Sequence, residues 1–201
     1  MGSYRQNGNV LVVTLILLLV FTVLGTASIG DVSLNQRTSA NYRDGNISFQ
    51  AAEAVLREAE QVALDLGASH EWENFDSNCS GDDCFTSTCS GGRCFNGTYP
   101  ASNDCASNPP SAPLWMDVST WESSGVAAVS TLDFSHLSES PKYIIEFMCF
   151  IPSDPVNTPN PTSNYPSAEW SYMYRITAYS KGEGSGSISM VQSTYKVDPN
   201  D

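Results

Sequence analysis

Six cysteines carry the clearest chemistry in this sequence, and all of them follow a long apolar run near the N-terminus. They are Cys79, Cys84, Cys89, Cys94, Cys105 and Cys149. Thiols bind zinc or oxidise to disulfides. Zinc ligands are normally paired more closely than the every-fifth-residue spacing of the first four, which lies at the edge of the range for a metal site. An even number of cysteines after an export signal is typical of disulfides, so we expect six disulfide cysteines and no metal.

The sequence alone does not choose among the possible pairings. The stretch around the first four cysteines is rich in Gly, Ser, Asn and Asp, so it has little apolar material to bury, and cross-links there would restrict the unfolded chain in place of a core. Cys149 lies in an expected core strand. One hypothesis pairs Cys149 with Cys105, which would attach the loop-rich middle of the chain to the sheet.

The other candidate residues form no catalytic constellation. Asp76, Asp82 and Asp83 favour a solvated acidic loop, since the D-x-D-x-D-G pattern of calcium loops is missing, although calcium binding stays open. His70 and His136 are far apart and lie in no motif. We therefore expect a protein that is not an enzyme and that carries no cofactor.

Two further patterns have simple structural interpretations. The stretch Gly182–Gly186 is neither a nucleophile elbow nor a phosphate loop, and a hairpin turn explains it. Four tryptophans suit either a carbohydrate-binding face or, as the better default, buried packing. They are Trp72, Trp115, Trp121 and Trp170. The net charge of −13 excludes nucleic acid as a partner, because phosphates would be repelled.

The apolar run from Val10 to Ala27 holds 18 residues without a charge. Its only polar side chains are Thr14, Thr22 and Thr26, whose hydroxyls can bond to the preceding helical turn. This length is just sufficient for a membrane-spanning helix. Arg5 in the short leader places the N-terminus in the cytoplasm.

Three interpretations compete for this run. A secretory signal would be cleaved near Thr26–Ser28. A plain single-pass anchor would stay uncut. In a prepilin, a short basic leader ends in Gly, here Gly8, and the apolar run is kept.

The residues that follow continue as a helix. From Phe49 to Leu66 apolar side chains recur at the spacing of an amphipathic helix, and Gly67 stands where such a helix ends. No proline lies between Val10 and Leu66, so we predict one helix on the order of 85 Å long. Its first part requires lipid or a bundle of similar helices, and its second part requires a folded domain.

Three strands are predicted to form that domain, in an α+β fold. They are Lys142–Ile151, Ser171–Ser180 and Ser187–Val197, with a hairpin loop between the last two. An antiparallel sheet of these strands needs a cover, which the apolar stripe from Ala52 to Leu66 provides. Pro152–Pro166 is predicted to be a connecting loop, with surface recognition as the alternative.

At this point the chain resembles PilX-type minor pilins. The resemblance rests on Arg5–Gly8 with the apolar run, on Asn41–Asp44 and Phe49–Ala54, and on Tyr174–Ala178 and Val191–Tyr195 at the C-terminal end. These stretches cover both ends of the chain, about a third of its length. The resemblance implies the pilin fold, in which a long N-terminal helix with a membrane-spanning first half packs on an antiparallel sheet with disulfide-stapled loops.

The resemblance also implies a division of the chain and a processing site. Residues 1–8 would be the leader, 9–30 the membrane and filament-core half of the helix, 31–67 its amphipathic half, and 68–201 an extracytoplasmic β-rich domain. A prepilin peptidase would cut between Gly8 and Asn9, and Asn9 would be methylated. The sequence departs from the major pilins at Asn9, where Phe is usual, and at Val13, where a glutamate is usual. The missing carboxylate predicts a low-copy subunit near the filament tip.

The function implied is that of a minor pilin that primes the type IV pilus and supports adhesion and twitching. Implied partners are other minor pilins, the major pilin and a PilY-type tip adhesin, and the subunit waits in the inner membrane before it enters the extracellular pilus. A membrane-anchored periplasmic or surface binding module, or a minor pseudopilin of type II secretion, is the alternative.

Overall fold

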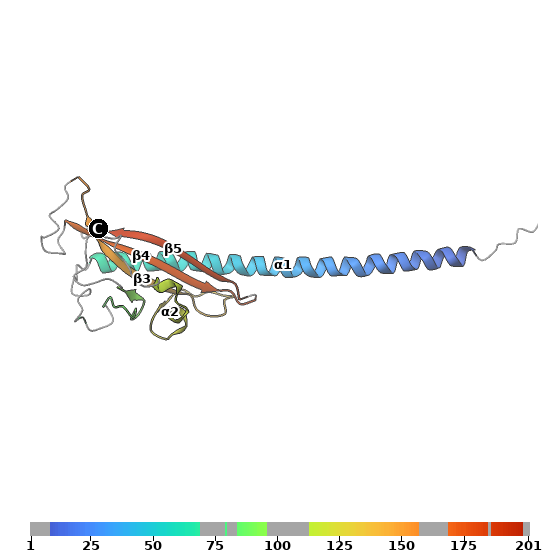
Figure 1. Ribbon diagram of the computed structural model, residues 1–201, viewed down its shortest axis with the longest axis horizontal. Helices are drawn as coiled ribbons and strands as arrows, with labels where there is room; N and C mark the ends of the chain where they lie inside the picture. The colour runs from blue at the N-terminus through green and yellow to red at the C-terminus, as the bar shows by residue number, and fades with distance from the viewer. Residues whose placement is uncertain are drawn as a thin grey trace, which may run out of the picture. The chain divides into compact units, whose positions relative to one another are not determined.

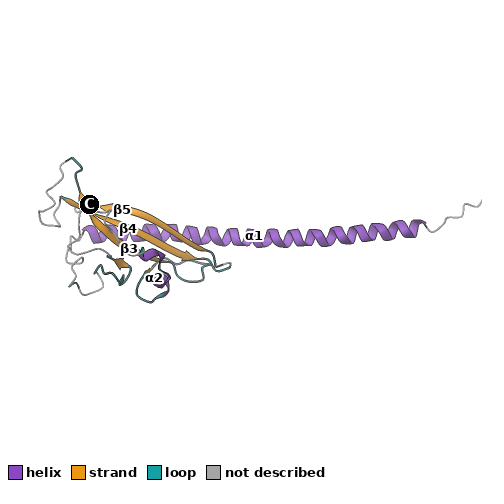
Figure 2. Ribbon diagram, viewed as in Figure 1, coloured by secondary structure: helices purple, strands orange, loops and turns teal. Residues whose placement is uncertain are grey.

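The computed structural model describes residues 9–68, 79, 84–95, 113–156, 169–184 and 186–198. Figures 1 and 2 show the helices and strands. They are α1 (Asn9–Ala68), β1 (Arg93–Cys94), the 3-10 helix η2 (Leu114–Met116), α2 (Val118–Glu122), β2 (Ala128–Val129), β3 (Lys142–Pro152), β4 (Trp170–Lys181) and β5 (Ile188–Val197). The chain divides into two units, Met1–Arg43 and Asp44–Asp201, which are described separately below.

The prediction of one long helix is confirmed, because α1 is continuous over 60 residues from Asn9 to Ala68. No proline interrupts it. It ends one residue beyond the predicted terminator, Gly67. The second unit contains the last part of this helix, from Asp44 onward, together with all strands.

The three long strands pair as predicted, and the α+β fold is confirmed. β3 pairs with β4 and β4 with β5, both antiparallel. The sheet is mixed rather than wholly antiparallel, because the two-residue strand β1 pairs with β3 in parallel. β2, also of two residues, pairs with β3 antiparallel. Such short strands have no periodicity of their own, so sequence patterns did not reveal them.

The main core lies between α1 and one face of the sheet. On the helix, Ala52, Val55, Ala59 and Ala63 have no exposed surface, which agrees with the predicted stripe. Alanine at three of these positions lets the helix approach the sheet closely. The facing side chains are large and stack edge to face or in parallel. They include Phe85, Phe147, Phe150, Tyr172, Tyr174 and Ile176.

A second, smaller core covers the opposite face of the sheet. Side chains alternate along a strand, so Ile144 and Tyr179 point away from α1 while their neighbours point toward it. Trp121 of α2 stacks on Tyr179 with ring centroids 5.0 Å apart. Cys89 and Cys94 belong to the same cluster. We call the face of the sheet that carries this second core the outer face.

The loop predicted at Pro152–Pro166 begins slightly later than expected. Pro152 is the last residue of β3, and Ser153 donates its N–H to the carbonyl of Glu169 at 2.9 Å. Residues 157–168 lie outside the described part of the chain, so its role in recognition stays a prediction.

Candidate assembly surfaces

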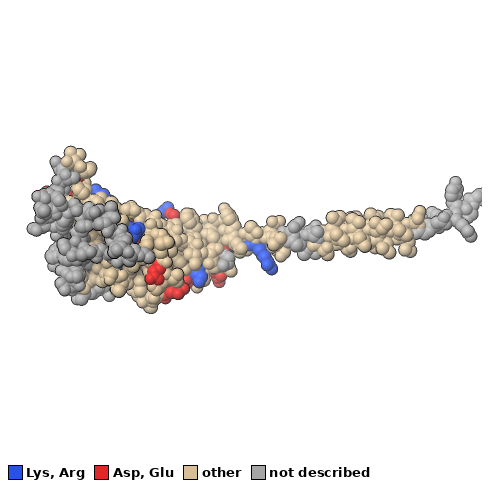
Figure 3. All heavy atoms as spheres, in the orientation of Figure 1, with Lys and Arg blue, Asp and Glu red and all other residues tan. Residues whose placement is uncertain are grey.

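The first candidate surface is the apolar segment Asn9–Thr26 at the start of α1. Its mean hydropathy is 2.5, and within the described residues it is the one helical stretch with the length and composition of a membrane span. Its large apolar side chains are exposed all round, with Leu18 66% and Phe21 67% accessible. Figure 3 shows an uncharged surface along this part of α1. At about 25 cal/mol per Å² of apolar surface, such a segment needs lipid or other helices around it.

The three threonines of this segment bond to their own helix. The Thr22 hydroxyl donates to the carbonyl of Leu19 at 2.8 Å, and that of Thr26 to the carbonyl of Val23 at 3.0 Å. The Thr14 hydroxyl bonds to the preceding turn in the same way. Since these hydroxyls need no water, they are compatible with a lipid or helix-lined environment.

In the second unit, a carboxylate of α1 fixes the β4–β5 turn. Asp44 is 6% exposed and accepts hydrogen bonds from the N–H of Gly184 at 3.1 Å and of Ser187 at 3.3 Å. Gly182 faces the same carboxylate, and a Cβ there would lie 2.5 Å from the Asp44 carboxyl group. Only glycine therefore fits at position 182. No local sequence pattern indicated this contact, which joins residues 140 positions apart.

Further polar contacts of α1 hold the segment after β2 and the strand β5. Glu58 accepts hydrogen bonds from the Ser130 hydroxyl and from the N–H of Thr131, the latter at 2.9 Å. Burial raises the pKa of Glu58, but the hydrogen bonds from Ser130 and Thr131 outweigh it, and the pKa lies below its ordinary value. The Ser193 hydroxyl of β5 donates to Glu60 at 2.8 Å. α1 is thus attached to the sheet by carboxylates as well as by its apolar stripe.

Two of the disulfides are local, each linking cysteines five positions apart. They are Cys79–Cys84 and Cys89–Cys94. Cys149 is disulfide-bonded as well. Its predicted partner, Cys105, lies outside the described residues, so the Cys105–Cys149 pairing remains a hypothesis.

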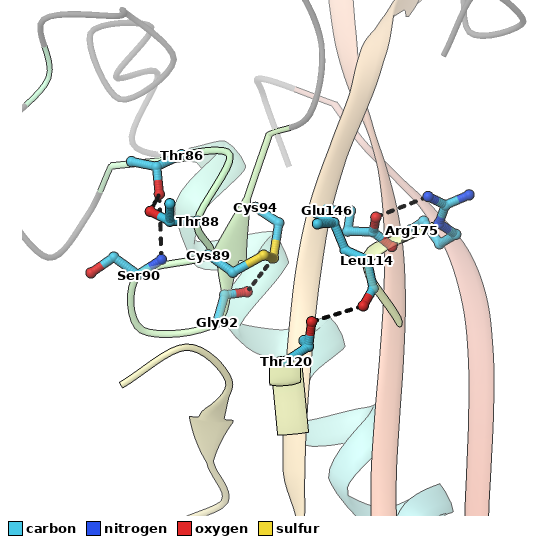
Figure 4. Close-up of a disulfide and its surroundings, with 10 residues drawn as sticks. All are labelled: Thr86, Thr88, Cys89, Ser90, Gly92, Cys94, Leu114, Thr120, Glu146 and Arg175. Atoms are coloured by element: carbon cyan, nitrogen blue, oxygen red, sulfur yellow. Dashed lines mark hydrogen bonds and ion pairs between the residues drawn. A yellow bond between two sulfur atoms is a disulfide. The ribbon is translucent and has the colours of Figure 1, made fainter. Parts of the chain in front are cut away.

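The Cys89–Cys94 disulfide closes a tight turn over the outer face (Figure 4). Gly92 has a φ of +82°, and a Cβ there would come within 2.7 Å of the Ala128 side chain. This close approach lets the Gly92 carbonyl accept the N–H of Ile145 at 2.7 Å, at the point where β1 joins the sheet. The disulfide therefore holds the turn that carries β1, and β1 forms an edge of the sheet. This role goes beyond the loop stapling that the sequence suggested.

A partly buried ion pair also lies on the outer face. Arg175 of β4 donates to both carboxylate oxygens of Glu146 of β3, at 2.8 and 2.9 Å (Figure 4). The hydrogen bond to Glu146 raises the pKa of Arg175. Residues 146 and 175 are direct cross-strand partners. Opposite charges at directly facing positions of two strands stabilise their pairing. This ion pair could have been predicted from the sequence if the strand register had been known.

A pocket of about 360 Å³ adjoins the second core. Its lining includes Met116, Val118 and Trp121 from η2 and α2, and Ile188 and Met190 from β5. The expectation that tryptophans pack in the core holds for Trp121 and Trp170, which are 5% and 1% exposed.

The remaining sequence candidates fall in other places. His136 is exposed, in a left-handed backbone conformation with a φ of 67°. His70, Trp72, Asp76, Asp82 and Asp83 lie outside the described residues. Gly8 does too, and Asn9 is the first residue of α1. No cluster of metal-ligating side chains occurs in the described ranges.

These features define a class of protein: a pilin-like subunit whose N-terminal helix begins with an exposed apolar span and ends packed on a β-sheet. The comparison with protein families identifies the family. Residues 7–57 match the model "PilX N-terminal", and residues 72–197 match "Type IV pilus assembly protein PilX C-term". The chain therefore belongs to the PilX family of type IV pilus assembly proteins, a structural family of minor pilins. No curated protein and no solved structure matches the chain.

Proposed function

We propose that this chain is a minor pilin that primes type IV pilus assembly from the inner membrane and is incorporated near the filament tip. Membership of the PilX family supports a role in type IV pilus assembly. The exposed apolar segment Asn9–Thr26 supports insertion in the membrane before assembly. This segment holds the precursor in the bilayer as a single pass with a cytoplasmic N-terminus. Extraction into the filament then exchanges lipid contacts for helix contacts and exposes little apolar surface to water.

Processing releases this segment from its leader. We propose cleavage between Gly8 and Asn9 and methylation of Asn9, followed by assembly with other minor pilins, the major pilin and a tip adhesin of the PilY type. Residues 9–30 would form the filament-core half of the helix, 31–67 its amphipathic half and 68–201 the exported domain, which supports adhesion and twitching.

The apolar side chain at Val13, which is 53% exposed, supports a tip-proximal position. A carboxylate at this place would attract the N-terminal ammonium group of a neighbouring subunit. Val13 lacks that attraction, which favours a low-copy subunit. Changing Val13→Glu should raise the copy number along the shaft, and unchanged copy number and position would refute the tip assignment.

The experiment that tests the function is the mass and N-terminal sequence of the mature chain, from cells with and without prepilin peptidase. A chain that begins at methylated Asn9, only when the peptidase is present, supports the proposal. A chain that begins at Met1 or after Ala27 in both strains refutes it and favours a membrane-anchored binding module. Recovery from purified pili, rather than from a secretion pseudopilus, separates the two machines that share such a leader.

A further inference from the structure

The strand β5 has one edge that no described strand covers. The sheet order is β1-β3-β4-β5, so β5 pairs only with β4 among the described strands. Gly182 donates its N–H to the carbonyl of Ser187 at 2.8 Å. This bond shows which residues of β5 direct their backbone groups toward β4, namely the odd-numbered ones. Alternate residues of β5 then direct their N–H and C=O groups away from β4. These are residues 188, 190, 192, 194 and 196, and we call this side of β5 the free edge.

The free edge lacks the devices that normally protect sheet edges. Natural edges are short, charged, bulged or interrupted by proline. β5 is ten residues long, and its register with β4 is unbroken from Tyr172↔Val197 to Lys181↔Ile188. Within β5, no charged residue and no proline occurs before Lys196. By contrast, the pairing of β3 with β4 contains a register shift, and the opposite edge of the sheet consists of two-residue strands.

Two side chains at the start of the free edge, Ile188 and Met190, line the apolar pocket. Residues 189, 191, 193 and 195 face α1, so the even-numbered residues lie on the outer face. Ile188 is 60% exposed and Met190 38%, and both line the pocket together with Trp121. A strand added to the free edge would place alternate side chains beside Ile188 and Met190, at the rim of this pocket.

We propose that the free edge of β5 binds an extended segment of a different polypeptide chain, which adds a strand to the sheet and places an apolar side chain against Ile188 and Met190. Backbone groups pointing outward in a row are recognised by another backbone, and the pocket adds side-chain specificity. The free edge itself carries no charge from Ile188 to Thr194, so an uncharged segment fits it best. The inference deepens the proposed function, on which it rests, by naming the kind of partner that the exported domain binds.

Two observations argue against a second copy of this chain as the occupant. α1 runs in the same direction as β5, since Ser48 meets Ser189 and Glu60 meets Ser193. Antiparallel pairing of two β5 strands would therefore point the domain parts of α1, from Asp44 onward, in opposite directions, whereas neighbouring subunits of one filament have the same orientation. In addition, each copy carries a net charge of −13, which opposes self-association.

The test uses the full chain in piliated cells, with the photo-crosslinking residue p-benzoylphenylalanine at position 192 or 194 and, as a control, at the exposed position 133. We expect adducts from 192 and 194 with one segment of one other chain, attached two residues apart because a strand has a period of two. We expect none from 133. Adducts with this chain itself, scattered attachment sites or no adducts would overturn the proposal.

A backbone substitution separates edge pairing from ordinary surface contact. Thr194→Pro removes an N–H that points to the free edge and leaves the ladder with β4 intact. It should reduce cross-linking from 192 at least ten-fold, whereas Thr194→Ala should preserve it. Thr194→Lys, which keeps the N–H but adds a charge, should weaken the cross-link too, so the test does not depend on proline folding well. Unchanged cross-linking in Thr194→Pro and Thr194→Lys would refute strand addition.

The N-terminus of the same cross-linked samples distinguishes the two proposals. A chain correctly processed at Asn9 but without adducts leaves the pilin function standing and removes the edge partner. Adducts with the two-residue spacing on an unprocessed chain support the edge partner and remove the pilin function.

Discussion

Two stretches of the single helix α1 differ in where their apolar side chains lie. Asn9–Thr26 is apolar on every side and exposed, whereas Ala51–Leu66 is apolar on one stripe, and that stripe is buried against the sheet. Both are helical, so secondary structure does not distinguish them. The distribution of apolar residues does, because a stripe is satisfied by one sheet of the same chain, while an all-round apolar surface requires surroundings that the chain does not supply.

The largest effect is expected from a charge in the buried stripe. Val55→Lys places an ammonium group at a position with no exposed surface, and we expect a loss of more than about 4 kcal/mol in the free energy of unfolding, enough to unfold the domain. Thermal unfolding of the full chain in detergent measures this. Gln61→Lys, exposed on the same helix, is the control and should change little. A stable Val55→Lys domain would contradict the helix–sheet packing.

The same substitution in the apolar segment should act on the membrane instead. Leu17→Lys costs about 2.5–3.5 kcal/mol of insertion free energy at the centre of a membrane helix. We expect less chain in the membrane fraction after carbonate extraction, with the thermal unfolding of the domain unchanged. Gln36→Lys, outside the segment, is the control. A lower melting temperature of Leu17→Lys would contradict the view that Asn9–Thr26 serves the membrane and only Ala51–Leu66 stabilises the domain.

The Cys89–Cys94 disulfide tests whether the outer face contributes to stability. Changing both cysteines to alanine releases a short loop, and we expect a loss of about 2 kcal/mol from the entropy of the unfolded chain. Chemical denaturation without reductant measures it, and Thr88→Ser in the same turn is the control. Because both cysteines belong to the second core and lie far from the apolar segment Asn9–Thr26 in the sequence, membrane retention should not change. A double variant as stable as the parent would exclude the turn from the cooperative domain.

The smallest effect concerns the polar contacts between α1 and the segment after β2. The pKa of Glu58 is lowered in the folded state, so its stabilising contribution is complete above its ordinary pKa of 4.5 and is lost as the pH falls through the lower, folded value. Glu58→Gln should therefore cost about 1 kcal/mol at neutral pH, and the difference from the parent should disappear in acid. Denaturation at pH 7 and pH 3 compares the two proteins. A difference that persisted at pH 3 would show that charge is not involved.

Some of the candidate site could be predicted because its signals are local. The uncharged run after Asn9 and the alternation in β4 are properties of neighbouring residues, and both elements lie where they were expected within a residue or two. The contact of Asp44 with the β4–β5 turn could not be predicted in this way. Its partners lie far along the chain, and nothing near Asp44 distinguishes it from a solvated carboxylate.

The sequence by itself determined that this chain has a helix too apolar for water, a second helical half with one apolar stripe, and three strands for the stripe to cover. These are consequences of periodicity and composition, which depend only on near neighbours. The tertiary structure decided which edge of the sheet is left open, because strand order is set by long-range pairing. It also decided that Gly182 and Gly92 must lack a side chain, since the atoms that exclude one come from distant parts of the chain.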